Sequence, residues 1–229
     1  MSYNPRMRKT VVGIFAHPDD EAFGPGGTLA KLSKTHDVYL LCATKGEVGQ
    51  IQNPEFRIKN QNLSKIREEE LRNAAEILGV KKVYFLGFKD GTLSNNLYHE
   101  LSAKIKRHLM KLKPETLITF EPQGVSGHID HIAVSMATSF VFWKLPFVKN
   151  LWQACRLYSK ERFEKQDYFI YFPKGYNRRE IDKIVDTTKF WDKKIKAMMC
   201  HKSQLSDIKR ILKFAEKMPK EEYFLVTKK

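Results

Sequence analysis

Two distant stretches of the sequence combine imidazole and carboxylate side chains at close spacing. The first is the run His-Pro-Asp-Asp-Glu from His17 to Glu21, and the second is the run His-Ile-Asp-His from His128 to His131. Zinc binds nitrogen and oxygen donors of this kind at about 2.0–2.2 Å. Catalytic zinc typically has three protein ligands and one open position, whereas structural zinc usually has four ligands rich in cysteine. A fold that brings both runs together would therefore hold a catalytic metal ion.

A phosphate-binding loop is the alternative for the first run, because Gly24-Pro25-Gly26-Gly27 precedes a predicted helix over residues 28–34. Glycine-rich turns before helices hold phosphate through backbone amides and, in many cases, a lysine. Asp19, Asp20 and Glu21 would repel an anion unless a cation lay between them. The acidic loop therefore favours a metal over a phosphate.

Each run follows a segment with the pattern of a buried strand. Val11 to Phe15 is apolar without polar alternation, which is typical of a parallel strand covered on both faces, and Pro18 ends it. The second run follows the strand-like segment Leu117 to Phe120 and precedes an apolar segment, Ile132 to Val141, that predicts a helix. Because ligands bind at the carboxyl edge of open α/β sheets, we expect both runs to meet in one crevice.

Strands and helices alternate along the rest of the chain. Strands are predicted over 38–43 and 82–86, and helices over 61–78, ending at Gly79, and 96–111. Extra C-terminal elements are expected as strands over 151–158 and 168–172 and helices over 188–200 and 206–217. The alternation predicts an α/β fold, with a Rossmann-like, mostly parallel sheet flanked by helices. No linker divides residues 1–229, which favours a single domain, and the long polar loop over 44–60 should serve the site.

The composition limits where the protein works and what it binds. No apolar stretch reaches the roughly 18 residues that span a bilayer, and no signal-peptide pattern is present. The three cysteines are widely spaced, which indicates a reducing compartment, so we expect a cytoplasmic protein. The net charge of +15 leaves open a different class of protein, a non-catalytic binder of nucleic acid or of an anionic surface. No nucleic-acid motif is recognisable, so no such partner is expected.

The two runs together resemble the PIG-L/LmbE-like family of zinc-dependent N-acetylglucosamine deacetylases. The resemblance continues in four shorter segments: Ala43-Thr44-Lys45-Gly46-Glu47, Arg67-Glu68-Glu69-Glu70-Leu71, Leu86-Gly87-Phe88-Lys89-Asp90-Gly91 and His201-Lys202-Ser203-Gln204. It implies one deacetylase domain that binds a single catalytic zinc, or another divalent ion. Its substrate would be an N-acetylglucosamine-containing small molecule or glycoconjugate.

The side chains of the two runs divide into ligands and reacting groups. His17, Asp20 and His131 are the predicted metal ligands. Asp19, next to a ligand but directed elsewhere by the loop, is the predicted general base, and the resemblance assigns the same roles. His128, if protonated, could stabilise the oxyanion of the tetrahedral intermediate, and its alternative is a capping or supporting histidine.

The remaining candidates have weaker signals. Asp130 is predicted to act with the catalytic group, either beside His128 or by capping the helix or orienting a histidine. Arg67 and Asp90 are substrate-binding candidates, for which the resemblance is the main support. Glu21 gains from the helix dipole and receives no catalytic role. Four other histidines lack ligand spacing and are interpreted as surface or packing residues: His36, His99, His108 and His201.

The motifs specify the bond that is cleaved and leave the rest of the substrate open. Members of the family act on acetylglucosamine attached to inositol, malate, phosphatidylinositol, antibiotics or another sugar, and some carry a tyrosine where this chain has Ser126. An amidase that removes a larger acyl group from an amino sugar conjugate is the neighbouring alternative. The expected partner is a small amino sugar conjugate, and a homo-oligomer is compatible with the sequence. Basic residues near the crevice favour an anionic conjugate: Lys45, Arg57, Lys59, Lys65, Arg67 and Lys89.

Overall fold

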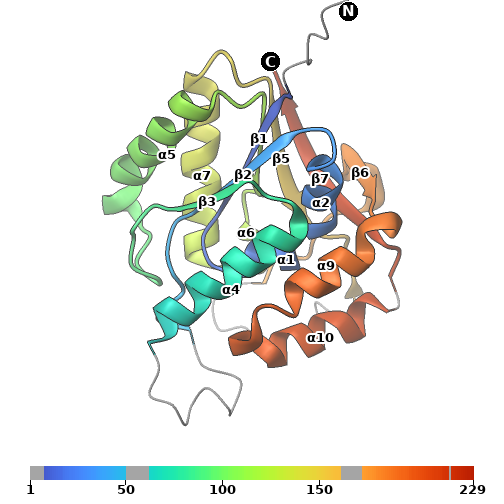
Figure 1. Cartoon of the computed structure of the whole chain (residues 1–229). Helices are drawn as coiled ribbons and strands as arrows, with labels where there is room; N and C mark the ends of the chain where they lie inside the picture. The colour runs from blue at the N-terminus through green and yellow to red at the C-terminus, as the bar shows by residue number, and fades with distance from the viewer. Residues whose placement is uncertain (1–7, 50–61, 161–171, 217) are drawn as a thin grey trace, which may run out of the picture.

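The computed structural model describes residues 8–49, 62–160, 172–216 and 218–229. The centre of this described part is one seven-stranded sheet, whose arrangement can be followed in Figure 1. The strands lie in the order β3-β2-β1-β4-β5-β7-β6. They are β1 (Thr10–Phe15), β2 (Asp37–Cys42), β3 (Lys82–Phe85), β4 (Thr116–Phe120), β5 (Asn150–Cys155), β6 (Lys183–Asp186) and β7 (Glu221–Lys228). Strands β1 to β5 are parallel, and β7 pairs antiparallel with both β5 and β6. The predicted α/β fold with a mostly parallel sheet is confirmed.

Strand β1 lies between β2 and β4, and all of its residues after Thr10 are buried. Val12 pairs with Tyr39 of β2 and with Leu117 of β4. A strand covered on both faces needs no polar alternation, which explains its uninterrupted apolar sequence. The chain that leaves Phe15 therefore enters the carboxyl edge of the sheet.

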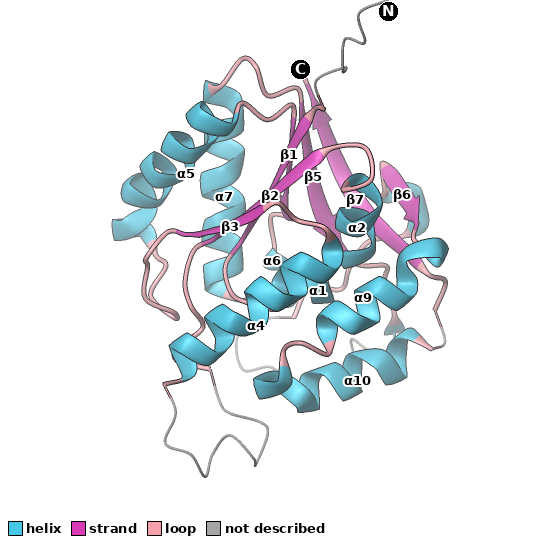
Figure 2. Cartoon of the chain, viewed as in Figure 1, coloured by secondary structure: helices cyan, strands magenta, loops and turns pink. Residues whose placement is uncertain are grey.

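Helices cover both faces of the sheet (Figure 2). Helices α5 and α7 pack together on one face, and α2, α4 and α9 pack together on the other. The helices are α1 (Asp20–Phe23), α2 (Gly26–Leu32), α4 (Leu63–Leu78), α5 (Tyr98–Leu112), α6 (Gly124–Gly127), α7 (Ile129–Lys144), α9 (Trp191–Met198) and α10 (Leu205–Ala215). Short 3-10 turns are η1 (Asn95–Leu97), η2 (Arg178–Glu180), η3 (Thr188–Phe190) and η4 (Lys202–Gln204).

The predicted helices are present with shifted ends. The helix predicted over 61–78 is α4, and Gly79 ends it with a φ of 78° and a hydrogen bond from its amide to the carbonyl of Ala75. Glycine adopts this left-handed conformation without a steric cost, so the predicted helix end is confirmed. The helices predicted over 96–111 and 188–200 each begin as a 3-10 turn, η1 and η3, before α5 and α9.

The C-terminal strands differ from the prediction. The segment predicted as an extra strand over 151–158 is β5, which pairs with β4 and extends the parallel part of the sheet. The antiparallel additions are β6 and β7, which the sequence pattern did not indicate. Strand β7 begins with Glu221 and Glu222, and the partners that bury Glu222 are distant in the sequence, so periodicity could not detect the strand.

Two expected segments cannot be compared. The predicted strand over 168–172 lies outside the described residues except for Phe172, which is not in a strand, and so does most of the loop over 44–60. In the part of the chain that the structure describes, no helix has the length and apolar character needed to cross a membrane.

Candidate metal centre

The two polar runs meet at the carboxyl edge of the sheet. His17 follows β1, Asp20 begins α1, and His131 lies in the first turn of α7. Nδ1 of His17 lies 3.2 Å from Nε2 of His131. Nε2 of His131 lies 3.3 Å from Oδ1 of Asp20, and Nδ1 of His17 lies 3.8 Å from Oδ2 of Asp20. The three predicted ligands thus form one triangle of residues, in which Asp20 faces the two imidazoles through different carboxylate oxygens.

Two sides of this triangle, at 3.2 and 3.3 Å, have the spacing of donor atoms around a tetrahedral zinc ion. Ligand bonds of about 2.0–2.1 Å place neighbouring donor atoms about 3.3 Å apart in a tetrahedron. Nδ1 of His131 lies 3.0 Å from the carbonyl oxygen of Gly124, so it carries the ring proton and Nε2 keeps its lone pair. That lone pair faces a second imidazole nitrogen and a carboxylate, and such a group of acceptors is stable only with a proton or a cation between them.

Two carboxylates hold the far side of the His17 ring. Nε2 of His17 lies 2.9 Å from Oδ1 of Asp90 and 3.2 Å from Oδ2 of Asp130. Asp130 is further held by the amides of Gly91 and Leu93, at 2.8 and 3.0 Å. Outer carboxylates of this kind fix the tautomer of a ligand histidine by accepting its proton. Nδ1 of His17 is thereby left for a metal.

The charges around His17 favour a cation. Burial alone lowers the pKa of His17, but hydrogen bonds to Asp130 and Asp90 and the charge of Asp20 outweigh burial and raise this pKa to about 10. Burial opposes ionisation of Asp90, yet its contacts with His17 lower its pKa to about 2. The cluster therefore favours a positive charge between these groups at neutral pH, either a proton on His17 or a metal ion.

Two other donor sets share His17. In one, ring nitrogens of His17, His128 and His131 lie within 4.8 Å of one another, and in the other, His17 combines with the two carboxylates on its far side. The second set uses Nε2, the nitrogen opposite the triangle. We favour His17, Asp20 and His131, because Nδ1 of His17, Nε2 of His131 and the Asp20 carboxylate face one another. Asp90 and Asp130 already bind Nε2 of His17, and Nδ1 of His128 accepts from a backbone amide.

Asp19 lies in the same loop and has a strained backbone. Its φ is 109°, and such conformations cost about 1–3 kcal/mol in residues other than glycine. Oδ2 of Asp19 accepts a hydrogen bond from Nη2 of Arg67 at 2.9 Å, and the amide of Asp19 donates to Oε2 of Glu21 at 3.0 Å. Burial raises the pKa of Asp19 to about 7, although the charge of Arg67 opposes the shift. A carboxyl group with this pKa can accept and release a proton at neutral pH.

A buried pair supports the loop. Oε1 of Glu21 lies 2.8 Å from Nε2 of His201, and the two residues are 1% and 0% exposed. Sequence reasoning assigned Glu21 to a helix dipole and His201 to the surface or to packing, and it missed their contact. The only available signal was the match of His201-Lys202-Ser203-Gln204 to the family. Because Glu21 also accepts from the Asp19 amide, this pair holds the strained backbone of Asp19.

Arg67 is buried rather than solvated, with 4% of the residue exposed. Besides Asp19, its guanidinium donates to the carbonyl oxygen of Pro18 at 2.6 Å and to that of Gly46 at 3.0 Å. Arg67 thus fixes the metal loop from helix α4, and it also lines the cavity described below. Its contact with a substrate stays a prediction, as does that of Asp90.

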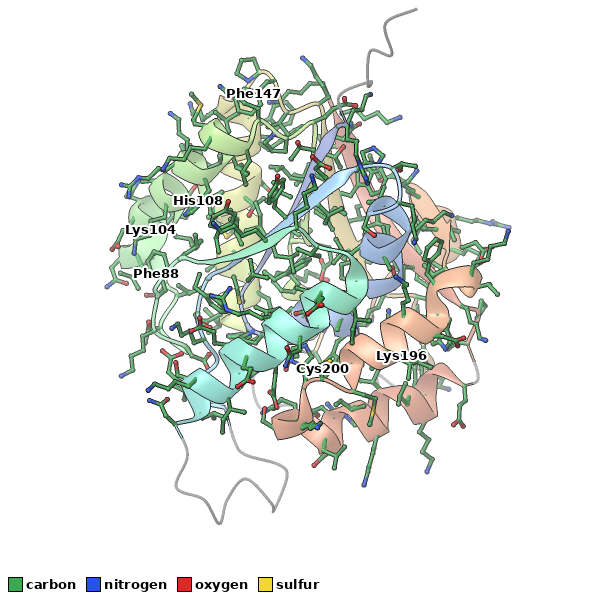
Figure 3. All side chains as sticks on the ribbon, in the orientation of Figure 1. Phe88, Lys104, His108, Phe147, Lys196 and Cys200 are labelled. Carbon is green, nitrogen blue, oxygen red and sulfur yellow. The ribbon has the colours of Figure 1, made fainter. Side chains whose placement is uncertain are left out.

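The loop that carries Asp90 is anchored to helix α5. Nζ of Lys104 donates to the carbonyl oxygen of Leu86 at 3.0 Å and lies 4.3 Å from the centre of the Phe88 ring (Figure 3). The amide of Val48 donates to Oδ2 of Asp90 at 3.1 Å. These contacts hold Asp90 in place beside His17.

His128 is the N-cap of helix α7 and lies beside the ligand rings. Its ring centre is 4.8 Å from that of His17 and 5.0 Å from that of His131. Nδ1 of His128 accepts a hydrogen bond from the Asp130 amide at 3.2 Å, so the neutral ring carries its proton on Nε2. Burial and the charge of His17 lower the pKa of His128. The protonated form of His128 that the sequence left open is therefore disfavoured, because the Asp130 carboxylate is bound to His17 and two amides.

The predicted site residues line one cavity of about 590 Å³. Ligand sites usually have volumes of about 300–1,000 Å³. The sequence-predicted residues in its wall are His17, Asp19, Asp20, Arg67, Asp90, His128 and His131, and Asp130 supports the wall through His17. The structure therefore brings all eight predicted metal, catalytic and substrate-binding candidates to one place.

The glycine-rich turn is occupied by a side chain of the protein itself. The amides of Gly27 and Thr28 donate to the carboxylate of Glu222 at 2.9 and 2.7 Å. Glu222 also forms a buried ion pair with Lys194 at 2.6 Å. A carboxylate from strand β7 thus takes the position that a phosphate would need, in agreement with the rejection of a phosphate loop.

Comparison with protein families identifies the chain. The family model described as PIG-L: GlcNAc-PI de-N-acetylase matches residues 12–142, which contain both polar runs. The chain belongs to the PIG-L family. The resemblance read from the two runs is confirmed.

A curated relative of this PIG-L protein is the "Probable N-acetyl-alpha-D-glucosaminyl L-malate deacetylase 2" of Bacillus cereus. The two are 33% identical over 142 residues, which cover 61% of this chain and 64% of the relative. The match therefore spans slightly less than two thirds of the relative's length.

Two solved structures share the fold. The N,N'-diacetylchitobiose deacetylase of Pyrococcus horikoshii has a TM-score of 0.71 at 24% identity, with 97% of this chain and 85% of that one covered. GalB, the 4-carboxy-2-hydroxymuconate hydratase of Pseudomonas putida KT2440, has a TM-score of 0.70 at 17% identity, with 96% of each chain covered. At these identities the likeness establishes the fold of this PIG-L protein, and its chemistry must be argued from its own residues.

Proposed function

We propose that this PIG-L protein is a zinc-dependent hydrolase that removes the N-acetyl group from an N-acetylglucosamine-containing small molecule. The observation that carries the proposal is the triangle of His17, Asp20 and His131 in one cavity with Asp19, whose pKa is raised to about 7. Amide hydrolysis at neutral pH needs a metal site next to a group that exchanges protons. The name of the Bacillus cereus relative supports the same reaction.

His17, Asp20 and His131 would hold the ion. When bound there, zinc supplies an acidified water and polarises the acetyl carbonyl group. Asp90 and Asp130 bind Nε2 of His17 and so keep its Nδ1 directed towards the other two ligands. Another divalent ion that accepts nitrogen and oxygen ligands would use the same donors.

Asp19 acts as the general base in this proposal. Its carboxylate takes a proton from the water whose oxygen bonds to the acetyl carbon, and it returns that proton to the sugar nitrogen as the C–N bond breaks. The products are acetate and a free amine. Arg67 and Glu21 hold one carboxylate oxygen and the amide of Asp19, which leaves Oδ1 to exchange the proton.

His128 stabilises the oxyanion. Because its Nδ1 accepts from the Asp130 amide, its Nε2–H is a donor in the neutral ring. A donor aimed at the oxygen of the tetrahedral intermediate lowers the barrier without any need for a charged imidazole. Asp130 is a positioning residue in this scheme, because it acts through His17 and through the N-terminus of α7.

A hydratase is the second candidate, since GalB shares the fold over 96% of this chain. Addition of water to a double bond also uses a base and an activated water, so the fold alone does not choose between the two reactions. We prefer deacetylation because the name of the Bacillus cereus relative specifies it.

The test is release of primary amine from methyl 2-acetamido-2-deoxy-glucopyranoside and from the L-malate conjugate of N-acetylglucosamine. We expect release by zinc-loaded protein, loss of release after chelation, and recovery on zinc addition. Asp19→Asn with normal zinc content serves as the matched inactive control. Absence of amine release from every acetamido sugar tried, with a full equivalent of zinc bound, would count against deacetylation.

We further propose that the protein is cytoplasmic and acts on a small molecule. Cys42, Cys155 and Cys200 are all free thiols, which suits a reducing compartment. Assembly into a homo-oligomer and the extent of a single domain over residues 1–229 stay predictions.

A further inference from the structure

We propose that the part of the cavity beneath helix α10 binds an alkyl or aryl group carried by the substrate. The inference rests on the proposed function for the reaction, because the same cavity contains the predicted metal ligands. It adds a substrate class: an acetamido sugar with a hydrophobic substituent.

The cavity has two chemically different parts. One part contains the imidazoles and carboxylates described above. The other lies between the carboxyl edge of the sheet and helices α9 and α10, and its wall is largely apolar: Phe23, Trp191, Met198, Ile211, Leu212 and Phe214. A bound molecule that presents its amide to the metal centre therefore extends from a polar site into an apolar one.

Helix α10 is incompletely buried on its apolar side. Ile208 is fully buried, but Ile211, Leu212 and Phe214 are only half-buried, and all three line the cavity. An amphipathic helix ordinarily buries its apolar stripe against the core. Here part of that stripe faces the cavity instead, so an apolar occupant would complete its burial.

The charged residues that α9, α10 and β7 contribute to the wall are already paired, and Arg156, also in the wall, donates to the carbonyl oxygens of Val125 and Pro173. Lys194 binds Glu222 at 2.6 Å, and Arg210 binds Asp207 at 2.8 Å. Glu221, also in the wall, is bound by Arg178 at 2.7 Å. An anionic group would have to compete with these carboxylates for each cation, whereas an alkyl group would leave the pairs intact.

As far as the structure describes them, the basic residues that led the sequence analysis to favour an anionic conjugate do not provide a free cation in the cavity wall. Among those that the structure describes, Lys45, Lys65 and Lys89 do not line the cavity, and Lys45 is paired with Glu68. Arg67 does line it, but its guanidinium is held by Asp19 and two carbonyl oxygens. Arg57 and Lys59 lie outside the described residues.

The hydrophobic group could come from two parts of the substrate, the glycosidic substituent or a longer N-acyl chain. Three substrates separate them: methyl and hexyl 2-acetamido-2-deoxy-glucopyranosides, and the methyl glycoside with an N-hexanoyl group, each below its micelle concentration. Each buried methylene contributes up to about fourfold in affinity. We expect at least a tenfold higher kcat/KM for one of the two hexyl substrates than for the methyl N-acetyl substrate.

The variants Leu212→Asn and Ile211→Asn place a polar group in the apolar wall. Each should reduce the hexyl-to-methyl ratio of kcat/KM at least fivefold. Lys213→Asn is the matched control, because Lys213 is exposed on the same helix and should leave that ratio unchanged. Thermal unfolding of each variant identifies any that fail to fold. If one of the two wall variants does not fold, the other carries the test.

A binding measurement separates this inference from the proposed reaction. Hexyl and methyl 2-amino-2-deoxy-glucopyranosides have no amide to cleave, and calorimetry gives their Kd directly. Tighter binding of the hexyl compound, weakened by Leu212→Asn, supports the apolar site even if no substrate is hydrolysed. Equal kcat/KM values for the three substrates together with equal Kd values for the two amines would overturn it, and so would a preference that survives both wall variants.

Discussion

Nε2 of His201 lies 2.8 Å from Oε1 of Glu21, and both side chains are almost completely buried behind the metal loop. The other carboxylate oxygen of Glu21 accepts from the amide of Asp19. The conformation of the proposed general base therefore depends on a residue that lies 180 positions from Glu21 in the sequence.

This ion pair should make stability depend on pH. Burial lowers the pKa of His201, but the charge and hydrogen bond of Glu21 outweigh burial, so the pKa is raised above 6.5. A raised pKa in the folded state gives stability that is fully present below the unfolded pKa and is lost as the pH rises through the folded pKa. The Tm advantage of wild type over His201→Gln should therefore shrink as the pH rises above about 6.5, the ordinary pKa of histidine. His99→Gln, at an exposed histidine, is the control. A constant Tm difference over this range would contradict the prediction.

Loss of the Glu21 carboxylate should misplace Asp19. We expect Glu21→Ala to lower kcat by about tenfold or more with bound metal unchanged, because nothing then holds the strained backbone of Asp19. Glu21→Gln keeps an acceptor for the Asp19 amide and should recover part of the activity. Metal content by elemental analysis and kcat against pH are the measurements. A variant whose kcat falls only in proportion to its folded fraction would point to a purely structural role.

Asp19→Asn tests the base directly. An amide cannot accept the proton of the attacking water, so kcat should fall by about 10²–10⁴-fold while zinc remains bound. The rising limb of the pH profile, attributed here to a carboxyl group with a pKa of about 7, should disappear with it. If Asp19→Asn kept activity near that of wild type, the general base would have to be another carboxylate, and Glu47 and Glu21 would be tested next.

The location of the metal centre could be predicted because the residues that indicate it lie close together in the sequence. The donors of each run lie within a few residues of each other, the strands before them have clear apolar patterns, and parallel strands direct both runs to one edge. The structure adds Asp90 to this cluster as a partner of His17, a contact that the sequence could not indicate because it joins two loops.

The features that sequence reasoning missed are polar contacts between distant segments. Glu222 binds the amides of Gly27 and Thr28, and Glu21 binds His201. The sequence around each carboxylate gives no sign that the residue is buried, because its partners come from distant segments and approach only in the folded chain. Strand β7 was missed for the same reason, because one of its inward side chains is a charged residue neutralised by Lys194.

Metal affinity should separate the ligands from the residues that support them. Asp20→Ala removes one of three donors and should abolish stoichiometric zinc binding. Asp130→Asn keeps all three donors but weakens the acceptor that fixes His17, so zinc affinity should fall about 10–100-fold. Competition with a zinc chelator of known affinity measures both. Equal losses in the two variants would mean that Asp130 is itself a ligand, and no loss in Asp130→Asn would leave its contact with His17 without a role in metal binding.

His128 provides the last prediction, because its neutral Nε2–H is proposed to serve the oxyanion. His128→Ala should retain zinc and lower kcat by about 10²–10³-fold, the usual cost of removing one oxyanion donor. His128→Gln offers an amide donor from the same position and should recover part of that loss, whereas a role that required a charged imidazole would give no recovery. KM should change less than kcat in both variants, since the donor acts mainly in the transition state. A rise in KM with unchanged kcat would instead make His128 a residue that binds the ground-state substrate.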